Sequence, residues 1–536
     1  MIELIAHNLA PIMFASLVAF LLLGYPVAFS LAANGLIFFV VGVELAPYSQ
    51  SITLDWPLLG LTIGRILDIM RNDTLLAIPF FTLMGIVLEK SGMAEDLLDT
   101  AGQLFGPIRG GLAYAVIFVG ALLAATTGVV AASVIAMGLI SMPIMLRYGY
   151  DRSLAAGVIT ASGTLAQIIP PSLVLIVLAD QLGVSVGPMY AGAILPGLML
   201  VGLFCLYIFA ITILQPARAP ALPIEARTLG SGVASLFVVL LMSVVIGVVS
   251  WWLLQGNVAR GAGIWGTAIA ATIAYGVALI DKRLKYDYLS HLAQQVIIVL
   301  IPPLALIFLV LGTIFLGIAT ATEGGAMGAT GALLMAWFKG RLPYRILSEA
   351  LDGTTRLACF VMFILIGSRV FSLTFYGVNG HIWVEELMTG LPGGVWGFLI
   401  AVNALVFVLG CFIDFFEIAF IVIPLLAPVA QKLGIDLVWF GIIIGMNMQT
   451  SFLTPPFGFA LFYMRSVAPN GPWVDKPTGR TIAGVTTAQI YRGGVAFIIL
   501  QLIMVAIVIA FPWLSIGKGE AKVDTDKIEI TLPSLD

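Results

Sequence analysis

Two stretches of this apolar chain combine hydroxyl and amide side chains with a proline pair. The first reads ASGTLAQIIPPS over residues 161–172, and the second reads MNMQTSFLTPPF over residues 446–457. Proline removes a backbone donor from a helix and clashes with the carbonyl one turn back, at a cost of about 3 kcal/mol. In a bilayer the freed backbone groups find no water. Each stretch therefore indicates either a packing kink or a broken helix whose oxygens hold a cation.

The first candidate cation site joins the first break to a polar turn upstream of it. Hard cations prefer oxygen ligands, and threonine, serine and glycine supply them without a competing positive charge. The alternative is that each hydroxyl bonds a carbonyl of its own helix. The predicted ligands are Thr126, Thr127 and Gly128 in the turn, and Ser162, Gly163, Thr164 and Gln167 in the break.

The second candidate cation site includes a carboxylate. Asp414 lies within an apolar run, where a carboxylate costs about 2.5–3.5 kcal/mol on an insertion scale and a cation would neutralise it. Asp414 can also serve as the N-cap of the helix that follows, and the two roles are compatible. Glu417, one turn further on, belongs to the same turn but ranks lower, because it can instead reach the outer water. The predicted ligands are Gly410, Asp414, Asn447, Gln449, Thr450, Ser451 and Thr454.

Four residues are predicted to contact a substrate. Glu323 follows Thr322 at the start of an apolar run, where it either contacts substrate or cation or only favours a helix N-terminus. Pro170 and Pro455 belong to the two breaks. Arg369 is the one arginine in the middle of an apolar run, and we expect it to snorkel or pair rather than to anchor a substrate.

The composition identifies the class of protein. Of 536 residues, 60% are hydrophobic and 10% are charged, whereas a soluble domain carries about 25% charged residues. The apolar runs are too long for the strands of a membrane barrel and therefore predict membrane helices. The formal charge of −3 gives no reason to expect a nucleic-acid partner. The cysteines and histidines show no metal or disulfide spacing.

Fourteen apolar runs are long enough to enter or cross a bilayer. Ten of them are continuous, and four contain an internal break. The continuous runs lie at 9–23, 27–45, 74–90, 187–213, 230–254, 263–281, 293–316, 322–338, 356–375 and 491–515, and the broken ones at 112–146, 153–180, 396–431 and 436–466.

Basic residues orient these runs, because cytoplasmic loops are rich in lysine and arginine. Arg109 and Arg147 flank the run 112–146 at both ends, which makes it a re-entrant hairpin from the cytoplasm. Glu385 and Glu386 precede 396–431, which becomes a hairpin from the opposite side. Counting the crossings places both termini outside the cytoplasm.

The two breaks belong to an internal repeat. When the chain is aligned with itself at an offset of 285 residues, Asp151 matches Asp436 without a gap. At the same offset the two proline pairs match each other, and one glycine and one further proline each match a residue of the same type. Because the copies enter from opposite sides, the repeats are inverted, and transporters with inverted repeats place their sites at the repeat interface. The predicted divisions are 1–213 (first repeat), 214–290 (inserted helix pair and linkers), 291–515 (second repeat) and 516–536 (polar tail).

At these motifs the chain resembles the large membrane subunit of tripartite ATP-independent periplasmic (TRAP) transporters. The helices at 230–254 and 263–281 are an insertion relative to a typical member, and the first turn has threonines where the family commonly has serines. The motifs are GYPVAFSL at 24–31, TTGVVAASVIAMGLISMPIMLRYGYDRSLAAGVITASGTLAQIIPPS at 126–172, GIATATEGGAMGA at 317–329 and FLTPPFGFALFYMR at 452–465.

The resemblance implies a secondary transporter rather than an enzyme, without a cofactor, driven by sodium ions and importing a small organic anion across the bacterial inner membrane. Its implied partners are a small four-helix membrane subunit and a periplasmic substrate-binding protein. It also implies an elevator mechanism, in which both hairpins and both broken helices move against a scaffold. Two alternatives stay open: a hairpin carrier that acts without these partners, and a membrane-embedded enzyme, which the lack of a nucleophile with a nearby base disfavours.

Overall fold

The computed structural model describes residues 2–516 except 50, 231, 256–260, 287, 457 and 476. Apart from one two-stranded ribbon, the regular structure in this part of the chain is helical. Nine of the described helices are long and apolar enough to cross a membrane, or ten if one bent pair counts as a single span. The prediction of an all-α polytopic membrane protein is therefore confirmed. The predicted tail lies outside the described residues beyond Ile516.

The chain begins with helices that lead to the first hairpin. The predicted span 74–90 begins three residues late, and α5 and α6 meet at 61°. These helices are α1 (Ile2–His7), α2 (Leu9–Leu22), α3 (Val27–Leu45), η1 (Ala46–Tyr48), α4 (Trp56–Met70), α5 (Ala77–Lys90) and α6 (Met93–Phe105).

The first broken run, predicted over 112–146, is a helical hairpin. Its turn contains Gly128 with φ +60°, a conformation that glycine adopts far more readily than other residues. The run predicted over 153–180 is a helix with a break that contains the proline pair. The elements are α7 (Gly111–Thr127), α8 (Val130–Arg147), α9 (Arg152–Thr164), η2 (Leu165–Gln167) and α10 (Leu173–Leu182), followed by α11 (Val186–Leu214).

The second hairpin and the second broken helix follow the same order of elements. The returning arm of this hairpin differs from the first because it contains a π-helical segment, which the sequence did not predict. The elements are α18 (Val395–Gly410), α19 (Phe415–Glu417), the π-helical segment η5 (Ile418–Val422), α20 (Ile423–Lys432), α21 (Leu437–Ser451) and α22 (Phe459–Val467).

Between the two units lie the inserted pair and four further helices. The span predicted at 356–375 is wrong at its start, because the helix α16 begins at Tyr344; its polar first turns are stabilised by ion pairs of Glu349 with Lys90 and Arg345. The elements are η3 (Pro216–Arg218), η4 (Ile224–Ala226), α12 (Val233–Leu254), α13 (Ala262–Leu284), α14 (His291–Phe315), α15 (Ala321–Phe338), α16 (Tyr344–Gly377) and α17 (Gly380–Thr389).

The C-terminal part returns to the centre of the molecule. A short antiparallel ribbon pairs Trp473 with Ile482. The elements are β1 (Trp473–Val474), β2 (Thr481–Ile482), α23 (Thr487–Ala510) and α24 (Trp513–Ile516).

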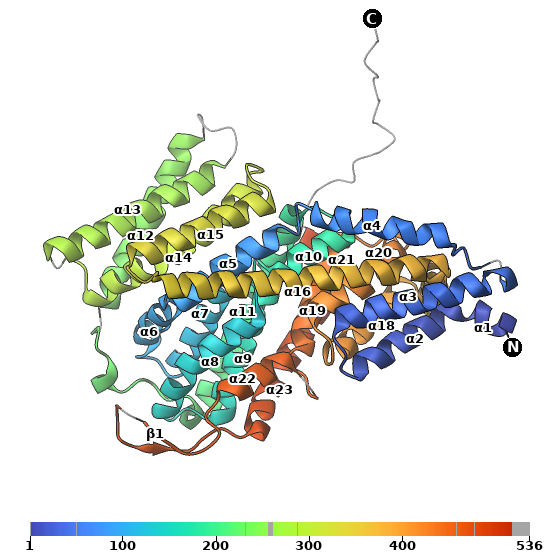
Figure 1. Ribbon diagram of the computed structural model, residues 1–536. Helices are drawn as coiled ribbons and strands as arrows, with labels where there is room; N and C mark the ends of the chain where they lie inside the picture. Colours follow the sequence, from blue (N-terminus) through green and yellow to red (C-terminus); the bar gives the residue numbers. More distant parts are fainter. Residues whose placement is uncertain are drawn as a thin grey trace, which may run out of the picture.

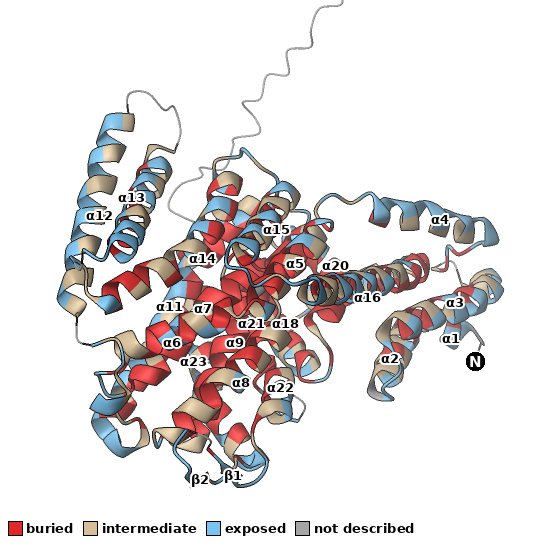
Figure 2. Ribbon diagram, turned by 60° about the vertical axis from the view of Figure 1, so that its left-hand side comes forward, coloured by how far each residue is buried: buried red, intermediate tan, exposed pale blue. Residues whose placement is uncertain are grey.

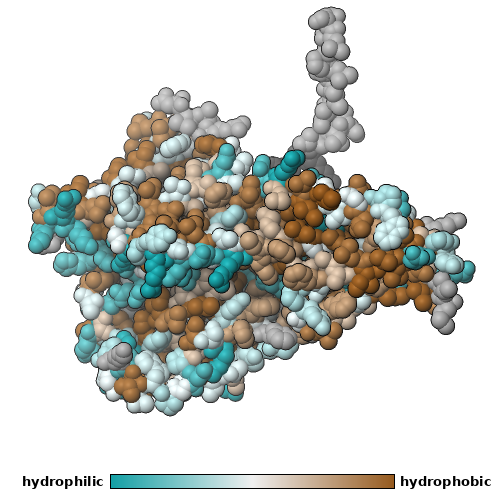
Figure 3. Space-filling model, viewed as in Figure 1, coloured by the Kyte–Doolittle hydropathy of each residue, from teal (hydrophilic) through white to brown (hydrophobic). Residues whose placement is uncertain are grey.

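The hairpins and broken helices form the buried centre of an elongated molecule. In Figure 1, α12 and α13 lie at one end, α1–α4 lie at the other, and α16 runs between them. Figure 2 shows buried residues concentrated in α7, α9 and α21, while α12 has no buried residue. Apolar side chains cover broad areas of the surface in Figure 3. Such a surface suits contact with lipid rather than water.

A close contact between two glycines brings α23 against the first broken helix. A Cβ atom on Gly157 would lie 3.1 Å from the Cα atom of Gly493, and one on Gly493 would lie 2.9 Å from the backbone nitrogen of Gly157. Small residues allow such backbone approach between membrane helices. Two turns further along both helices, Thr164 meets Gln501.

Candidate ion-binding site at the two helix breaks

Aspartate caps position both broken helices. The Asp151 carboxylate accepts a hydrogen bond of 2.9 Å from the backbone nitrogen of Leu154 at the start of α9. The Asp436 carboxylate accepts one of 2.8 Å from Trp439 at the start of α21. An N-cap of this kind satisfies a backbone donor that the helix leaves free. The two aligned aspartates therefore have the same local role.

Each break is held by hydroxyl groups. In the first, the Ser172 hydroxyl donates to the carbonyl of Gln167 at 2.7 Å and so bridges the non-helical residues. In the second, the Thr454 hydroxyl donates to the carbonyl of Thr450 at 3.0 Å. The Pro170–Pro171 and Pro455–Pro456 peptide bonds lie within the breaks, and both are cis.

The two breaks meet at one threonine. The Thr164 hydroxyl accepts hydrogen bonds from the Nε2 atoms of Gln449, at 3.3 Å, and Gln501, at 3.2 Å. Thr164 and Gln449 are equivalent positions at the offset of 285 residues. Equivalent residues meet in this way when two halves are related by a two-fold axis through the contact. The two aligned stretches therefore contact each other at Thr164.

Three amide side chains near this contact carry oxygens without a hydrogen-bond partner among the described residues. Gln167, Gln449 and Gln501 are each 0% exposed, and their Oε1 atoms accept no hydrogen bond there. Leaving a buried polar atom unsatisfied costs about 1–3 kcal/mol, and most such atoms in native proteins have a partner. Amide oxygens of this kind can act as ligands of a hard cation.

Part of the first predicted site is brought together. Gly128 in the hairpin turn packs against α10, where its Cβ would lie 3.2 Å from the backbone nitrogen of Leu173. The hydroxyls of Thr126 and Ser162, however, donate to carbonyls of their own helices, at 2.9 Å and 2.6 Å. Gly163 packs against α8 at Val134. The side chain of Thr127 lies outside the described residues.

The second predicted site shows a similar pattern. Gly410 packs against the break, where its Cβ would lie 2.8 Å from the Cβ of Ser451. The Asn447 amide donates to the carbonyl of Asn403 on α18 at 2.6 Å. The hydroxyls of Thr450 and Ser451 donate to Met446 and Met448 on their own helix.

The two carboxylates of the second hairpin lie at its turn. Asp414 is half-buried and precedes α19 as its N-cap, and its backbone nitrogen donates to the Glu417 carboxylate at 3.0 Å. The alternative that Glu417 reaches the outer water is wrong, because this residue is 6% exposed, and its carboxylate stays at the predicted turn by accepting the hydrogen bond from Asp414. Neither carboxylate forms an ion pair with a described residue.

Comparison with known proteins identifies the family of the chain. The family model described as "Tripartite ATP-independent periplasmic transporter, DctM component" matches residues 14–514. The chain belongs to the DctM family. The resemblance inferred from the motifs is therefore confirmed.

Relatives of this DctM chain extend over most of its length. It is 29% identical to the C4-dicarboxylate TRAP transporter large permease protein DctM of Pseudomonas aeruginosa, over 84% of this chain and 88% of that protein. It is 25% identical to the isethionate TRAP transporter permease protein DctMQ of Oleidesulfovibrio alaskensis, over 85% of this chain and 60% of that protein.

A solved structure shares the fold. The crystal structure of the YdaH transporter of Alcanivorax borkumensis matches with a TM-score of 0.51 at 13% identity, over 90% of this chain and 99% of that chain. At this identity the likeness concerns the fold alone.

The predicted substrate contacts of this DctM chain have different surroundings. Glu323 is exposed and forms a capping box with Thr320, whose backbone nitrogen donates to the Glu323 carboxylate at 2.8 Å. The Thr322 hydroxyl bonds the carbonyl of Asp73. Pro170 is buried, whereas Pro455 is exposed.

Sequence reasoning missed Gln501. It contacts Thr164 from α23, a helix for which the repeat alignment gives no equivalent at the breaks. The available signal was a lone amide in the apolar run 491–515.

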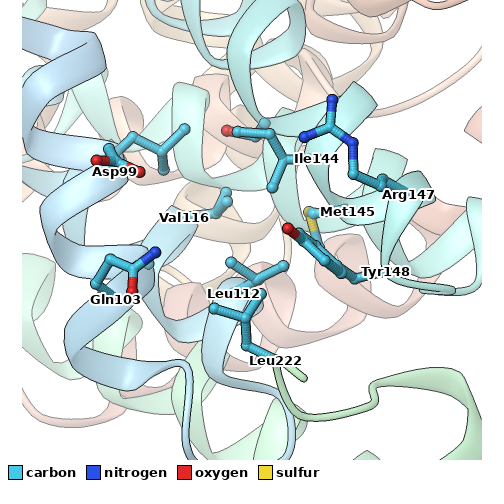
Figure 4. A pocket seen from close by; sticks show the side chains of 12 residues that line it. Asp99, Gln103, Leu112, Val116, Ile144, Met145, Arg147, Tyr148 and Leu222 are labelled. Atoms are coloured by element: carbon cyan, nitrogen blue, oxygen red, sulfur yellow. The ribbon is translucent and has the colours of Figure 1, made fainter. Parts of the chain in front are cut away.

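A separate cavity of about 110 Å³ lies between α6 and the first hairpin, and none of the predicted ligands lines it. Figure 4 shows Asp99 and Gln103 on one wall and Arg147 and Tyr148 on the opposite one. Arg147 donates to the Asp475 carboxylate through Nη2 at 2.8 Å and through Nε at 2.9 Å. This pair fastens the ribbon β1–β2 to the end of α8.

We expect the docking of this ribbon to depend on pH only in acid. The hydrogen bonds from Arg147 lower the pKa of Asp475 below its ordinary value of 3.8. A lowered pKa contributes stability above the unfolded-state value, and this contribution is lost as the pH falls through the folded-state value. Hydrogen exchange of residues 473–482, corrected for intrinsic rates, should stay slow from pH 7 to about 4 and become faster only below.

Substituting Asp475→Asn should remove this protection already at pH 7. The matched control is Glu225→Gln, an exposed carboxylate in another loop. Slow exchange of the ribbon in the Asp475→Asn protein would show that the ion pair does not hold it.

Proposed function

We propose that this chain is the large membrane subunit of a sodium-driven importer of small organic anions. The observation that carries the proposal is the set of fully buried Oε1 atoms of Gln167 and Gln449 in the broken helices and of Gln501 on the neighbouring α23. A sodium ion would give these oxygens the partner that they lack and would couple the two breaks.

An anionic substrate follows from the relatives. The names of these relatives refer to C4-dicarboxylates and to isethionate, which are small molecules with carboxylate or sulfonate groups. One sodium ion would compensate the charge of isethionate, and two would compensate that of a C4-dicarboxylate. Family membership supports an inner-membrane location, and the charge distribution in the loops favours termini on the periplasmic side.

Family membership also supports two partners, a small membrane subunit and a periplasmic binding protein. The relative named DctMQ is longer than the part that this chain matches. This extra length is consistent with a large subunit that works together with a second membrane segment.

An elevator movement agrees with the packing. Helices α3 and α16 approach so closely that a Cβ atom on Gly35 would lie 2.9 Å from the backbone nitrogen of Phe371. This pair is a candidate for the fixed scaffold. The hairpins and broken helices form the other compact unit, which we propose carries the ion and the substrate.

Uptake into proteoliposomes tests the proposal. Vesicles that contain this chain and the small subunit, supplied with the binding protein, should accumulate succinate or isethionate when sodium is higher outside. Accumulation should fall at least tenfold when potassium replaces sodium. Equal uptake in both salts would contradict sodium coupling, and undiminished uptake without the partners would favour the independent hairpin carrier.

A further inference from the structure

Two arginines line one cavity between α4 and α16. The cavity has a volume of about 320 Å³ and is lined by Arg65, Asp68, Ile69, Asn72, Leu75 and Arg369. Arg65 is half-buried and Arg369 is exposed. No hydrogen bond or ion pair joins either guanidinium to a described residue. Of the two roles expected for Arg369, snorkelling or pairing, the pairing is therefore not found in this part of the chain.

The backbone brings the two arginines to the same cavity. Thr53, just before α4, donates to the carbonyl of Gly377 at the end of α16, through its backbone nitrogen at 2.8 Å and its hydroxyl at 3.1 Å. From this point α4 folds back along α16. At 1.5 Å per residue, Arg369 lies roughly 12 Å from Gly377 along its helix, and Arg65 lies roughly 18 Å from Thr53. The lining residues of α4 share one helical face because they are spaced by three or four positions.

The cavity adjoins the hairpins and the broken helices. At its floor, the Asn72 amide donates to Asp180 at the end of α10 at 2.7 Å. Ser368, the neighbour of Arg369, donates through its hydroxyl to the carbonyl of Phe420 in η5 at 2.5 Å. The cavity therefore lies where the candidate scaffold helix α16 meets both proposed moving elements.

The charge of the cavity favours an anion. Two arginines and one aspartate leave one net positive charge on its lining. Guanidinium groups bind carboxylate, sulfonate and phosphate oxygens through paired hydrogen bonds. Two such groups without a protein partner, beside buried Ile69 and Leu75, form a site for a small oxyanion with an apolar stem.

We propose that Arg65 and Arg369 form an entry subsite that binds the carboxylate or sulfonate group of the substrate before it reaches the helix breaks. This assignment rests on the proposed function for the identity of the anion, although the binding of an oxyanion can be measured without transport. In the topology derived from the loop charges, α4 and the end of α16 lie on the periplasmic side, where an imported substrate arrives.

Direct binding tests the subsite. The probes are radiolabelled succinate and isethionate, added without sodium to the purified full chain in phosphatidylcholine nanodiscs. Arg369→Gln and Arg65→Gln should each weaken binding at least tenfold, and Arg369→Lys should weaken it less. The matched control is Arg71→Gln, an exposed arginine that ends α4 but does not line the cavity; its binding should equal that of the wild type.

Several results would overturn the subsite. One is that neither probe binds saturably to the wild type. Another is that the Arg369→Gln protein binds as tightly as the wild type, and a third is that Arg71→Gln loses as much binding as Arg369→Gln. Loss of binding on adding phosphatidylglycerol would assign the arginines to lipid phosphate and contradict substrate capture. If wild-type vesicles show no sodium-driven uptake but binding still depends on Arg369, the proposed function fails and the oxyanion site stands. If Arg369→Gln binds the probes and transports normally, the subsite fails alone.

Discussion

Replacing Thr164 with valine is expected to abolish the sodium dependence of uptake and to destabilise the protein. The Thr164 hydroxyl accepts hydrogen bonds from Gln449 and Gln501 at the meeting point of the two breaks. Valine has a similar shape but no acceptor, so two fully buried amide groups would each lose a partner. Each loss costs about 1–3 kcal/mol. The melting temperature in detergent and uptake over a sodium titration would measure the two effects.

A neighbouring threonine provides the matched control for this substitution. Thr160 is also 0% exposed, but its hydroxyl donates only to carbonyls of its own helix, at Ala156 and Gly157. Thr160→Val should therefore leave the sodium dependence intact, and Thr164→Ser should preserve it as well. Wild-type melting and wild-type sodium dependence in the Thr164→Val protein would contradict both the packing role of the hydroxyl and the cation site.

The position of the breaks was predictable because proline acts locally. A proline pair in an apolar run removes helix hydrogen bonds whatever surrounds it, and both breaks contain their pair. The caps at Asp151 and Asp436 were also predictable from the sequence, since an aspartate before a helical run is a local signal. The alignment of these residues predicted two similar units.

Side-chain partners were less predictable, since they depend on tertiary contacts. A hydroxyl in a helix can bond its own backbone or point to a neighbour, and the sequence did not distinguish these outcomes for Ser162 or Thr450. For Glu417 the sequence left outer water open as an alternative, whereas the carboxylate caps the hairpin turn. Gln501 lies 52 residues after Gln449, and only the close approach of Gly157 and Gly493 brings it to the site.

Asp414 is the second position at which we expect a large effect. Its side chain lies half-buried beside Phe415 and Phe416 at the turn of the second hairpin, without an ion-pair partner among the described residues. Moving an uncompensated carboxylate within a membrane is costly. A bound cation would compensate the charge of Asp414 and so favour movement of the hairpin. Asp414→Asn keeps the shape and a capping oxygen but removes the charge. We expect sodium-driven uptake to fall at least tenfold in this variant. We also expect a smaller rise in its melting temperature when sodium is added.

Two further variants separate the charge of Asp414 from its capping role. Asp414→Ala also removes the cap, which contributes about 0.5–2 kcal/mol, so it should melt lower than Asp414→Asn while losing a similar share of uptake. Asp436→Asn changes an equivalent N-cap at the start of α21 and should retain the sodium response. If Asp414→Asn transports like the wild type and only Asp414→Ala is impaired, the carboxylate is a cap alone, because the charge would then contribute nothing that the amide cannot replace.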